Sequence, residues 1–226
     1  MRAMVLNEPG KLVAADVTLP VRKRHEAMIN VTHGGICGTD LKIYEGGIPT
    51  PYPLIMGHEM IGTVVEGSSN DDFHEGSRVI VDPVLSCGNC FFCNNGLPQK
   101  CHDMFKYGHV SSKDHPHFTG GFAQYIILKK GTYIFKIPTT LSDKEVAPLM
   151  CVGATVVSGL SASNFQPYDS VVIQGVGAFG LYACAFTKQL GAKTVIAIDK
   201  IDKRLELAKQ FGADFGININ SNPDPV

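Results

Sequence analysis

The sequence has almost no net charge, and its basic residues form no cluster. Its 226 residues include 20 Lys and Arg against 21 Asp and Glu, which gives a formal net charge of −1 at pH 7. Nucleic-acid binders gather Lys and Arg on one face, and proteins that bind anionic membranes carry polybasic patches. The sequence has neither pattern, so we expect neither nucleic acid nor a membrane as a partner.

Long apolar runs are also missing. No stretch approaches the ~18 uninterrupted apolar residues that indicate a membrane-spanning helix. Residues 1–10 carry no apolar run behind a basic start, so we expect no secretory signal and a cytoplasmic protein. In such a protein, the seven cysteines indicate metal or thiol chemistry more than disulfides.

Internal repeats and low-complexity tracts are absent, and an apolar content of 44% is ordinary for a globular protein. A chain of 226 residues is long enough for one large or two small domains. The first half is rich in Gly, Pro and short β-like runs, which predicts an irregular all-β domain. Its expected strands are 28–32, 61–66, 78–83 and 123–129.

The second half has the pattern of an α/β domain. Ser142 followed by Glu145 is a capping-box pattern that predicts a helix start, with helical periodicity through 147–161. After residue 169 strands alternate with helices, which is typical of a parallel sheet. We place the boundary after residue 152, giving domains 1–152 and 153–226. The expected elements of the α/β part are strand 170–174, helix 181–190, strand 194–198, helix 203–211 and a third strand within 213–219.

Four cysteines stand within fifteen residues, in the spacing C-x2-C-x2-C-x7-C. Cys87, Cys90, Cys93 and Cys101 can hold one tetrahedral zinc, and such a closed site is structural because it leaves no position for substrate. A disulfide framework and an iron–sulfur cluster are the alternatives. A ferredoxin-type run would have three residues before its last cysteine and a proline after it. Here seven residues intervene and no proline follows, which favours zinc in a lobe of about residues 86–102.

The segment from Gly175 to Gly180, GVGAFG, has the dinucleotide-binding pattern G-x-G-x-x-G. It follows an expected strand and opens an expected helix, with Ala178 and Phe179 at the variable positions. Gly175 permits a tight turn, Gly177 lets the backbone approach a pyrophosphate, and Gly180 lets helix and strand pack closely. The alternative is a tight turn that binds nothing.

Asp199 ends the next expected strand, nineteen residues after Gly180. A carboxylate there can bind the adenosine ribose hydroxyls and would repel a 2′-phosphate, so the sequence favours NAD over NADP. The basic side chains of Lys200 and Arg204 weaken that preference, and Arg204 is a further candidate for contact with the cofactor.

Cys37, His58, Glu59 and Cys151 are the remaining candidates for metal ligands. Two thiolates and one imidazole leave the fourth position of a tetrahedral zinc open for water or substrate, which is a catalytic arrangement. Taken singly, each residue has an ordinary alternative. The cysteines can be small buried hydrophobes, and His58 can be a loop histidine with satisfied hydrogen bonds.

Together these pieces resemble the zinc-containing medium-chain alcohol dehydrogenases. The motifs occur in the family's order and span nearly the whole chain: CGTD at 37–40, GHE at 57–59, the four-cysteine lobe, APLMC at 147–151 and the glycine segment at 175–180. The resemblance implies a GroES-like β-rich catalytic domain followed by a Rossmann domain. It also implies two zinc ions per chain and hydride transfer between an alcohol and NAD.

The resemblance also implies residue roles. Cys37, His58 and Cys151 match catalytic zinc ligands, and Glu59 matches a carboxylate that lies near the metal and ligates it in some members. Whether Cys151 or Glu59 is the third ligand stays open. Asp40 matches the partner that fixes the tautomer of the zinc-bound histidine.

The implied chemistry uses zinc as a Lewis acid that lowers the pKa of the alcohol, which then transfers a hydride to the nicotinamide. Thr39 matches the hydroxyl that takes up the alcohol proton. Many members end this relay with a histidine three residues later, where this chain has Lys42. We therefore hypothesise that Lys42 faces an anionic group on the substrate; a solvated surface lysine is the alternative.

Two segments bear on the substrate. Residues 96–101 and 106–109 are similar to dehydrogenases associated with phosphonate metabolism, and polyol and threonine dehydrogenases are close competitors. A secondary alcohol, a polyol or a hydroxyalkylphosphonate is therefore the expected substrate class. His109, His115 and His117 form a loop that we interpret as a surface or cleft-edge segment and not as a third metal site.

The chain stops after roughly two βα units of the nucleotide-binding domain, whereas the family is longer. We therefore expect a C-terminally truncated member that binds zinc but turns over little alcohol, from a parent that is a homodimer or homotetramer. Two other functions stay open. A zinc-independent quinone or enoyl reductase of the same fold would lack both metal clusters, and a non-catalytic zinc-ribbon binding protein would hold one zinc.

Overall fold

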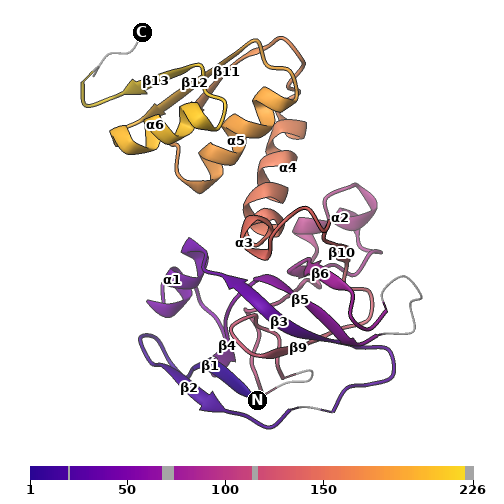
Figure 1. The fold of residues 1–226 in the computed structure, drawn as a ribbon. Helices are drawn as coiled ribbons and strands as arrows, with labels where there is room; N and C mark the ends of the chain where they lie inside the picture. Colours follow the sequence, from indigo (N-terminus) through magenta and orange to yellow (C-terminus); the bar gives the residue numbers. More distant parts are fainter. Residues whose placement is uncertain (20, 68–73, 114–116, 222–226) are drawn as a thin grey trace. The chain divides into compact units, whose positions relative to one another are not determined.

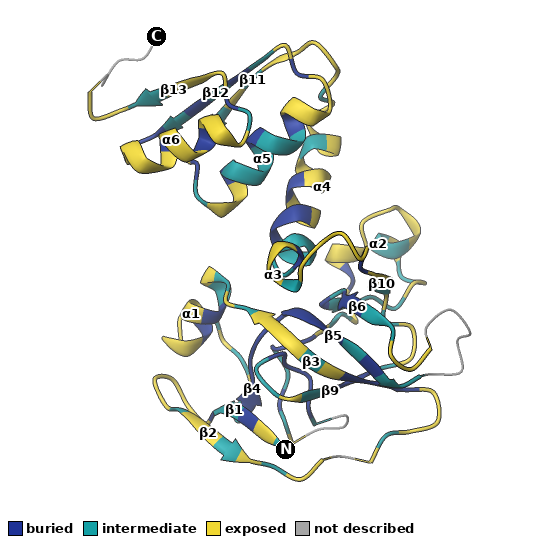
Figure 2. Cartoon of the chain, in the orientation of Figure 1, coloured by how far each residue is buried: buried dark blue, intermediate teal, exposed yellow. Residues whose placement is uncertain are grey.

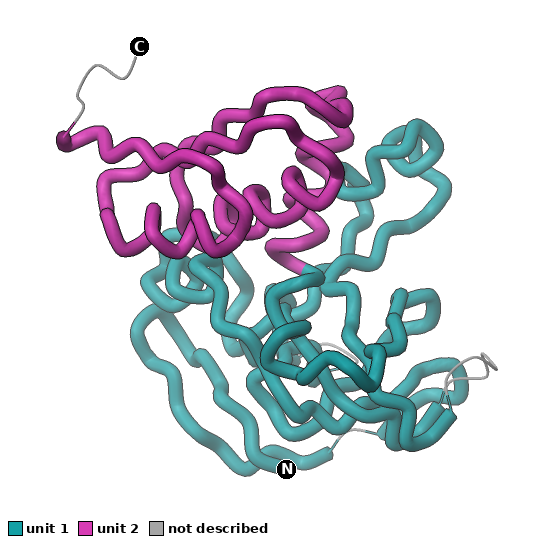
Figure 3. The backbone as a smooth tube through the Cα atoms, turned by 45° about the horizontal axis from the view of Figure 1, so that its top comes forward, with its two compact units in different colours: residues 1–150 teal, residues 151–226 magenta. Residues whose placement is uncertain are grey.

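Helices and strands are arranged in two compact units (Figure 1). Each unit has a buried core of its own (Figure 2). The units are Met1–Met150 and Cys151–Val226 (Figure 3). The computed structural model describes residues 1–19, 21–67, 74–113 and 117–221.

A five-stranded antiparallel sheet forms the centre of the first unit, in the order β10-β6-β5-β3-β9. The four strands expected in this part of the chain are confirmed as β3, β5, β6 and β9. The short edge strand β10 was not predicted. The bounds are β3 Ala27–Gly35, β5 Glu59–Glu66, β6 Arg78–Val81, β9 Tyr125–Leu128 and β10 Ile134–Lys136.

Strand β3 is longer than its sequence predicts. It continues through Gly34 and Gly35, which have poor strand propensity, because they pair with Met60 and Glu59 on β5. A side chain at Gly35 would clash with the Glu59 carboxylate. The glycine therefore makes the room in which Glu59 is buried.

Two smaller sheets complete the strands of the first unit. β1 and β2 were not predicted, because each five-residue strand has one charged residue at an end and four apolar residues, and so lacks the polar–apolar alternation that indicates a strand. These strands form because they pair with one another. β1 lies between β2 and β4, and β7 pairs with β8. Their bounds are β1 Arg2–Leu6, β2 Leu12–Asp16, β4 Leu54–Ile55, β7 Val84–Leu85 and β8 Phe105–Lys106.

The helix that begins after residue 142 has the predicted capping box. The Ser142 N–H donates to Glu145 Oε2 at 2.7 Å, and the Glu145 N–H donates to Ser142 Oγ at 3.4 Å. The prediction of regular helix through 161 is only partly right, because a π-helical turn interrupts it. The elements are α3 Asp143–Val146, the π-helical turn Leu149–Gly153 and α4 Ala154–Ala162.

The helical stretch Asp143–Ala162 is long and apolar enough, by length and composition, to cross a membrane. Core helices of soluble proteins pass the same test. The first part of this stretch packs as a core helix does, since Val146 lies in one apolar cluster with Ile61 and Ile80 of the central sheet. These contacts favour a core helix over a membrane span.

A parallel three-stranded sheet, in the order β11-β12-β13, forms the second unit with two helices. All five elements expected after residue 169 are confirmed, although the first helix starts three residues earlier than predicted, at Ala178. The bounds are β11 Ser170–Gln174, α5 Ala178–Gln189, β12 Thr194–Asp199, α6 Asp202–Gln210 and β13 Phe215–Asn218.

Helices α5 and α6 cover one face of this sheet. Leu205 and Ala208 are the buried residues of α6, and they pack in a cluster with Val195 of β12. Because side chains alternate along a strand, the other face is apolar as well. On that face Val172 is 58% and Phe215 is 59% exposed, so the described residues leave it uncovered.

Candidate functional site

The four-cysteine cluster lies in the loop between β7 and β8, which also holds α2 Phe91–Asn94 and the 3₁₀ turn Pro98–Lys100. The four Sγ atoms all lie within 4.8 Å of one another. The Cys90–Cys93 and Cys87–Cys93 Sγ separations are 3.5 and 4.0 Å, which is too long for a disulfide. A tetrahedral zinc with ~2.3 Å bonds would separate its sulfurs by roughly 3.8 Å. The loop therefore has the spacing of a four-thiolate site.

Hydrogen bonds and burial shift the pKa values of two of these thiols in opposite directions. The pKa of Cys90 is lowered to about 6, chiefly by the N–H of Cys93. The N–H of Cys87 lowers the pKa of Cys101, but burial and thiol–thiol hydrogen bonds outweigh it and raise that pKa to about 11. Because metal ligation requires thiolates, metal binding here would release protons.

The second cluster draws on three separate segments of the chain. The ligand atoms of Cys37, His58, Glu59 and Cys151 all lie within 4.8 Å of one another. Cys37 directly precedes α1 Gly38–Tyr44, and His58 and Glu59 stand at the start of β5. Cys151 lies in the π-helical turn and directly follows the last residue of the first unit. Two thiols, an imidazole and a carboxylate form a donor set that suits zinc.

Asp40 organises this dispersed cluster from α1. Its Oδ1 lies 3.4 Å from His58 Nδ1, and the two side chains are only 2% and 7% exposed. Its Oδ2 accepts a hydrogen bond of 2.8 Å from the Cys37 N–H. The contact with Asp40 engages Nδ1 of His58, which leaves Nε2 as the nitrogen that can ligate a metal.

Thr39 and Lys42 follow Cys37 on the same helix. Thr39 Oγ1 lies 3.7 Å from Cys37 Sγ. Burial raises the pKa of Cys37, but hydrogen bonds from Thr39 and His58 outweigh it and lower that pKa. Lys42 lies one helical turn beyond Thr39 and is exposed. The Thr39 hydroxyl therefore lies beside the cluster.

His109 lies closer to the dispersed cluster than the sequence suggested. Its half-buried ring packs against His58, with ring centroids 5.6 Å apart. Its Nδ1 lies 3.0 Å from the Tyr107 carbonyl oxygen, so Nδ1 carries the proton and Nε2 is the accepting nitrogen. Burial lowers the pKa of this imidazole. His115 lies outside the described residues, and the position of His109 is set by the fold alone.

The glycine-rich turn joins β11 to α5. Gly175 has φ +86°, a conformation that favours glycine. A Cβ at Gly177 would meet nothing within 4 Å, whereas a Cβ at Gly180 would clash with the backbone of Gly175. Ala178 and Phe179 begin α5, and among the described residues no side chain caps that helix start. Its free N–H groups and the open space at Gly177 therefore suit a pyrophosphate.

Asp199 braces this turn. Its Oδ2 accepts a hydrogen bond from the Val176 N–H at 2.9 Å, and its Oδ1 accepts from Lys200 and Ile201 at 2.8 and 3.0 Å. Burial raises its pKa, but these N–H groups outweigh burial and lower it. Arg204 Nη1 lies 3.8 Å from Oδ2. A carboxylate has about four acceptor positions, so at most one stays open for a ribose hydroxyl.

Sequence comparison identifies the family. Residues 23–139 match the alcohol dehydrogenase GroES-like domain, and residues 178–226 match the zinc-binding dehydrogenase family. The chain therefore belongs to the zinc-type medium-chain alcohol dehydrogenases. The predicted fold class, a GroES-like β-rich domain followed by part of a Rossmann domain, is confirmed.

Several relatives are similar over nearly the whole chain. It is 35% identical to sorbitol dehydrogenase of Bacillus subtilis and 32% identical to an NAD-dependent alcohol dehydrogenase of Sulfolobus acidocaldarius, over 97% and 95% of this chain. A crystal structure of an alcohol dehydrogenase from Thermotoga maritima matches with a TM-score of 0.93 and 29% identity, over 97% of this chain. The matches cover 61%, 63% and 63% of those proteins, so the chain spans less than two thirds of their length.

Proposed function

We propose that the protein transfers a hydride between an alcohol and NAD, with a catalytic zinc at the dispersed cluster. The observation that carries this proposal is the convergence of Cys37, His58, Glu59 and Cys151 within 4.8 Å, from segments far apart in the sequence. Membership of the alcohol dehydrogenase family supports the same chemistry. When bound, zinc would supply a Lewis acid that lowers the pKa of the alcohol, and NAD would supply the hydride acceptor.

The residues around the cluster would orient the alcohol and move its proton. Cys37, His58 and Cys151 or Glu59 would hold the metal, and Asp40 would keep the His58 ring in the tautomer that ligates. Thr39 Oγ1, beside Cys37 Sγ, is placed to accept the hydroxyl proton of the substrate.

Lys42 distinguishes this chain from members with a histidine at the same place. Its ammonium group is exposed and has no ion-pair partner among the described residues. We propose that it pairs with an anionic group on the substrate, which favours a hydroxyalkylphosphonate over a neutral polyol or secondary alcohol. If Lys42→Met left the KM for anionic alcohols unchanged, that role would be lost.

The glycine-rich turn would hold the cofactor. Gly175, Gly177 and Gly180 shape the turn, and Ala178 and Phe179 begin the helix whose N–H groups would meet the pyrophosphate. The Asp199 carboxylate would repel a 2′-phosphate, which supports NAD over NADP. Arg204 lies beside it and would contact the ribose side of the cofactor.

A second zinc would be structural and held by Cys87, Cys90, Cys93 and Cys101. Metal analysis separates the alternatives. Two zinc ions per chain support the proposal, one supports a non-catalytic zinc-ribbon protein, and none supports a zinc-independent reductase. A substrate panel with NAD, containing hydroxyalkylphosphonates, polyols and threonine, then tests the activity itself.

The proposal extends to the setting of the protein. We propose catalytic and cofactor domains at 1–152 and 153–226, a cytoplasmic location and a homodimeric or homotetrameric assembly. A small alcohol or carbonyl compound would be the partner, with neither nucleic acid nor membrane involved. Size-exclusion chromatography with light scattering tests the assembly.

A further inference from the structure

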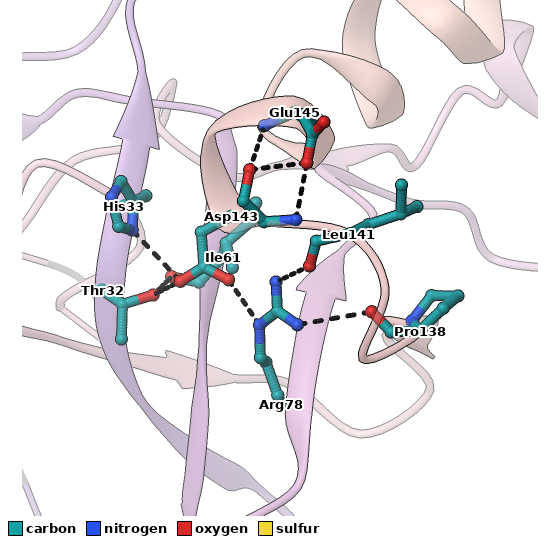
Figure 4. A network of polar contacts seen from close by, with 9 residues as sticks. Thr32, His33, Ile61, Arg78, Pro138, Leu141, Asp143 and Glu145 are labelled. Carbon is teal, nitrogen blue, oxygen red and sulfur yellow. Dashed lines mark hydrogen bonds and ion pairs between the residues drawn. The ribbon is translucent and has the colours of Figure 1, made fainter.

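Asp143 opens α3 and accepts hydrogen bonds from two strands of the central sheet (Figure 4). Its Oδ2 lies 2.6 Å from Thr32 Oγ1 and 3.1 Å from His33 Nδ1, both on β3. Its Oδ1 lies 2.5 Å from Arg78 Nε on β6. Hydrogen bonds to an ionised group are roughly twice as strong as neutral ones. One carboxylate therefore ties the helix start to two strands.

Arg78 extends this tie to the segment that leads into α3. Its Nη2 donates to the Leu141 carbonyl at 2.5 Å and its Nη1 to the Pro138 carbonyl at 3.4 Å (Figure 4). The Arg78 and Asp143 side chains are 31% and 15% exposed, so the pair is partly shielded from water. Partial shielding makes such a contact stronger than a fully exposed ion pair.

The strands that meet at Asp143 are those that deliver the dispersed cluster. β3 continues three residues beyond Thr32, and Cys37 lies two residues after the strand ends. β5 starts at Glu59 and lies between β3 and β6, with its Ile61 carbonyl 3.4 Å from the Thr32 hydroxyl. The Thr32 hydroxyl has a single proton, which it donates mainly to Asp143 because that contact is the shorter of the two.

The helix that starts at Asp143 delivers the remaining ligand. Cys151 follows eight residues later, and the intervening turns are held to the same strands by apolar contacts. Hydrogen bonds to Asp143 thus fix the start of the segment 143–151, and apolar packing fixes its middle. The apolar cluster contains Ile61, Ile80, Ile137 and Val146, with Ala147, Leu149 and Met150 packed against it.

We propose that Asp143 is a positioning residue for the dispersed cluster, holding the helix that delivers Cys151 against the strands that deliver Cys37 and Glu59. The strands are already joined by their own hydrogen bonds. Loss of the Asp143 carboxylate would therefore loosen the helix start and leave the sheet intact. The inference rests on the proposed zinc site and concerns how that site is assembled.

A simpler role for Asp143 would be to stabilise its own helix. The neighbouring Ser142 and Glu145 provide the matched control, because the hydrogen bonds of their capping box join these two residues to each other at the same helix start. A residue that acts only on the helix would behave like Ser142. A positioning residue would alter the geometry of Cys151 beyond that.

The test uses the whole chain and compares Asp143→Asn with Ser142→Ala. The first readout is the rate at which each bound zinc passes to a chelator. The second is the alkylation rate of Cys151 in the metal-free protein, followed by mass spectrometry. Cys184 is fully buried and serves as the internal reference.

We expect Asp143→Asn to release the zinc of the dispersed cluster on the order of tenfold faster, the lower end for residues that orient metal ligands. Cys151 should also be alkylated faster, while the lobe zinc is unaffected. Ser142→Ala should change neither rate by more than about twofold. Equal effects of the two variants, or no change in either readout for Asp143→Asn, would overturn the inference.

Two further outcomes are separated by the same design. If the wild-type chain holds only the lobe zinc, the proposed catalytic site fails, and the alkylation rate alone decides the role of Asp143. If Asp143→Asn does not fold, Thr32→Val decides it, because it removes a single bond to the same carboxylate. A Thr32→Val chain with wild-type rates in both readouts would then overturn the inference.

Discussion

The two candidate metal-ligand clusters differ in how much of the chain is needed to build them. The lobe cluster takes its thiols from residues 87–101, whereas the dispersed cluster spans residues 37–151, yet both bring their ligand atoms within 4.8 Å. In the lobe, one short loop supplies every ligand. In the dispersed cluster, the ligands come together only where the antiparallel sheet and the helix after residue 142 are in place.

This difference determines which interactions stabilise the arrangement of ligands in each cluster. The outermost ligands are 14 residues apart in the lobe and 114 apart in the dispersed cluster. Closing the longer loop costs roughly 2 kcal/mol more in chain entropy. The sheet hydrogen bonds and apolar core meet that cost in the dispersed cluster. The lobe has no buried side chain in its helix α2, so a metal would hold it.

The largest effect is expected from Cys93→Ser. Apparent zinc affinities of small four-ligand sites are ~10–16 kcal/mol, and they are folding energy for the segment that binds. We expect loss of one zinc per chain and rapid proteolysis within the lobe, with the second zinc retained. Metal analysis and limited proteolysis measure this. A lobe that stayed protease-resistant without zinc would break the comparison.

His58→Ala should have the opposite signature. The dispersed cluster would lose its zinc, and the proposed hydride transfer to NAD would stop. The melting temperature should change little, because the surrounding sheet holds the fold. Zinc content, steady-state NAD reduction and thermal unfolding check this, with Cys93→Ser as the reference. Unfolding as severe as in that reference would show that metal holds both clusters.

Asp40→Asn should be milder. The amide can still meet the Cys37 N–H but loses the charge beside His58 Nδ1. Residues in this position typically contribute ~10–100-fold to metal affinity or activity. A competitive zinc titration should show that loss at the dispersed cluster and none at the lobe. Equal weakening of both sites would contradict a local role for Asp40.

The smallest effect concerns acid stability. Burial raises the pKa of Asp143, but hydrogen bonds from Thr32, Arg78 and His33 outweigh it and lower that pKa in the folded chain. The carboxylate therefore stabilises the fold above its unfolded pKa of about 3.9, and this stabilisation is lost as pH falls through the lower folded value.

Urea unfolding of the metal-free protein tests this pH dependence. The stability difference between wild type and Asp143→Asn should be constant above about pH 5 and shrink below about pH 4. Ser142→Ala, which leaves this carboxylate in place, should show no such dependence. A difference that grew towards acid would reverse the assigned direction of the pKa shift.

Local signals were sufficient for some elements. The Ser142–Glu145 capping box and the strand–turn–helix around Gly175 each depend on residues that are close together in the sequence. The structure contains both. The extension of β3 through Gly34 and Gly35 could not be predicted, because pairing with β5 overrides their low strand propensity. The π-helical turn at Cys151 also has no local signal.

Parts of the candidate site could not be predicted from the sequence either. His109 lies 51 residues from His58 along the chain, and the two rings meet only because the fold brings these segments together. Asp143 is an acidic residue in the first turn of a helix, which is a common pattern. Only the approach of β3 and β6 makes its carboxylate an acceptor for both strands. Contacts between segments that are distant along the chain produce no characteristic spacing in the sequence, so they could not be predicted from it.

The sequence by itself indicated the family, the four-cysteine spacing and the glycine-rich turn, because each depends on residue type and on motifs within short segments, and the family resemblance proposed the second set of candidate metal ligands. Only the tertiary structure decided that residues 37, 58, 59 and 151 meet, that Asp199 braces the turn with most of its acceptor positions, and that Asp143 joins helix and strands. Those contacts depend on which segments pack together, and packing is a property of the whole chain.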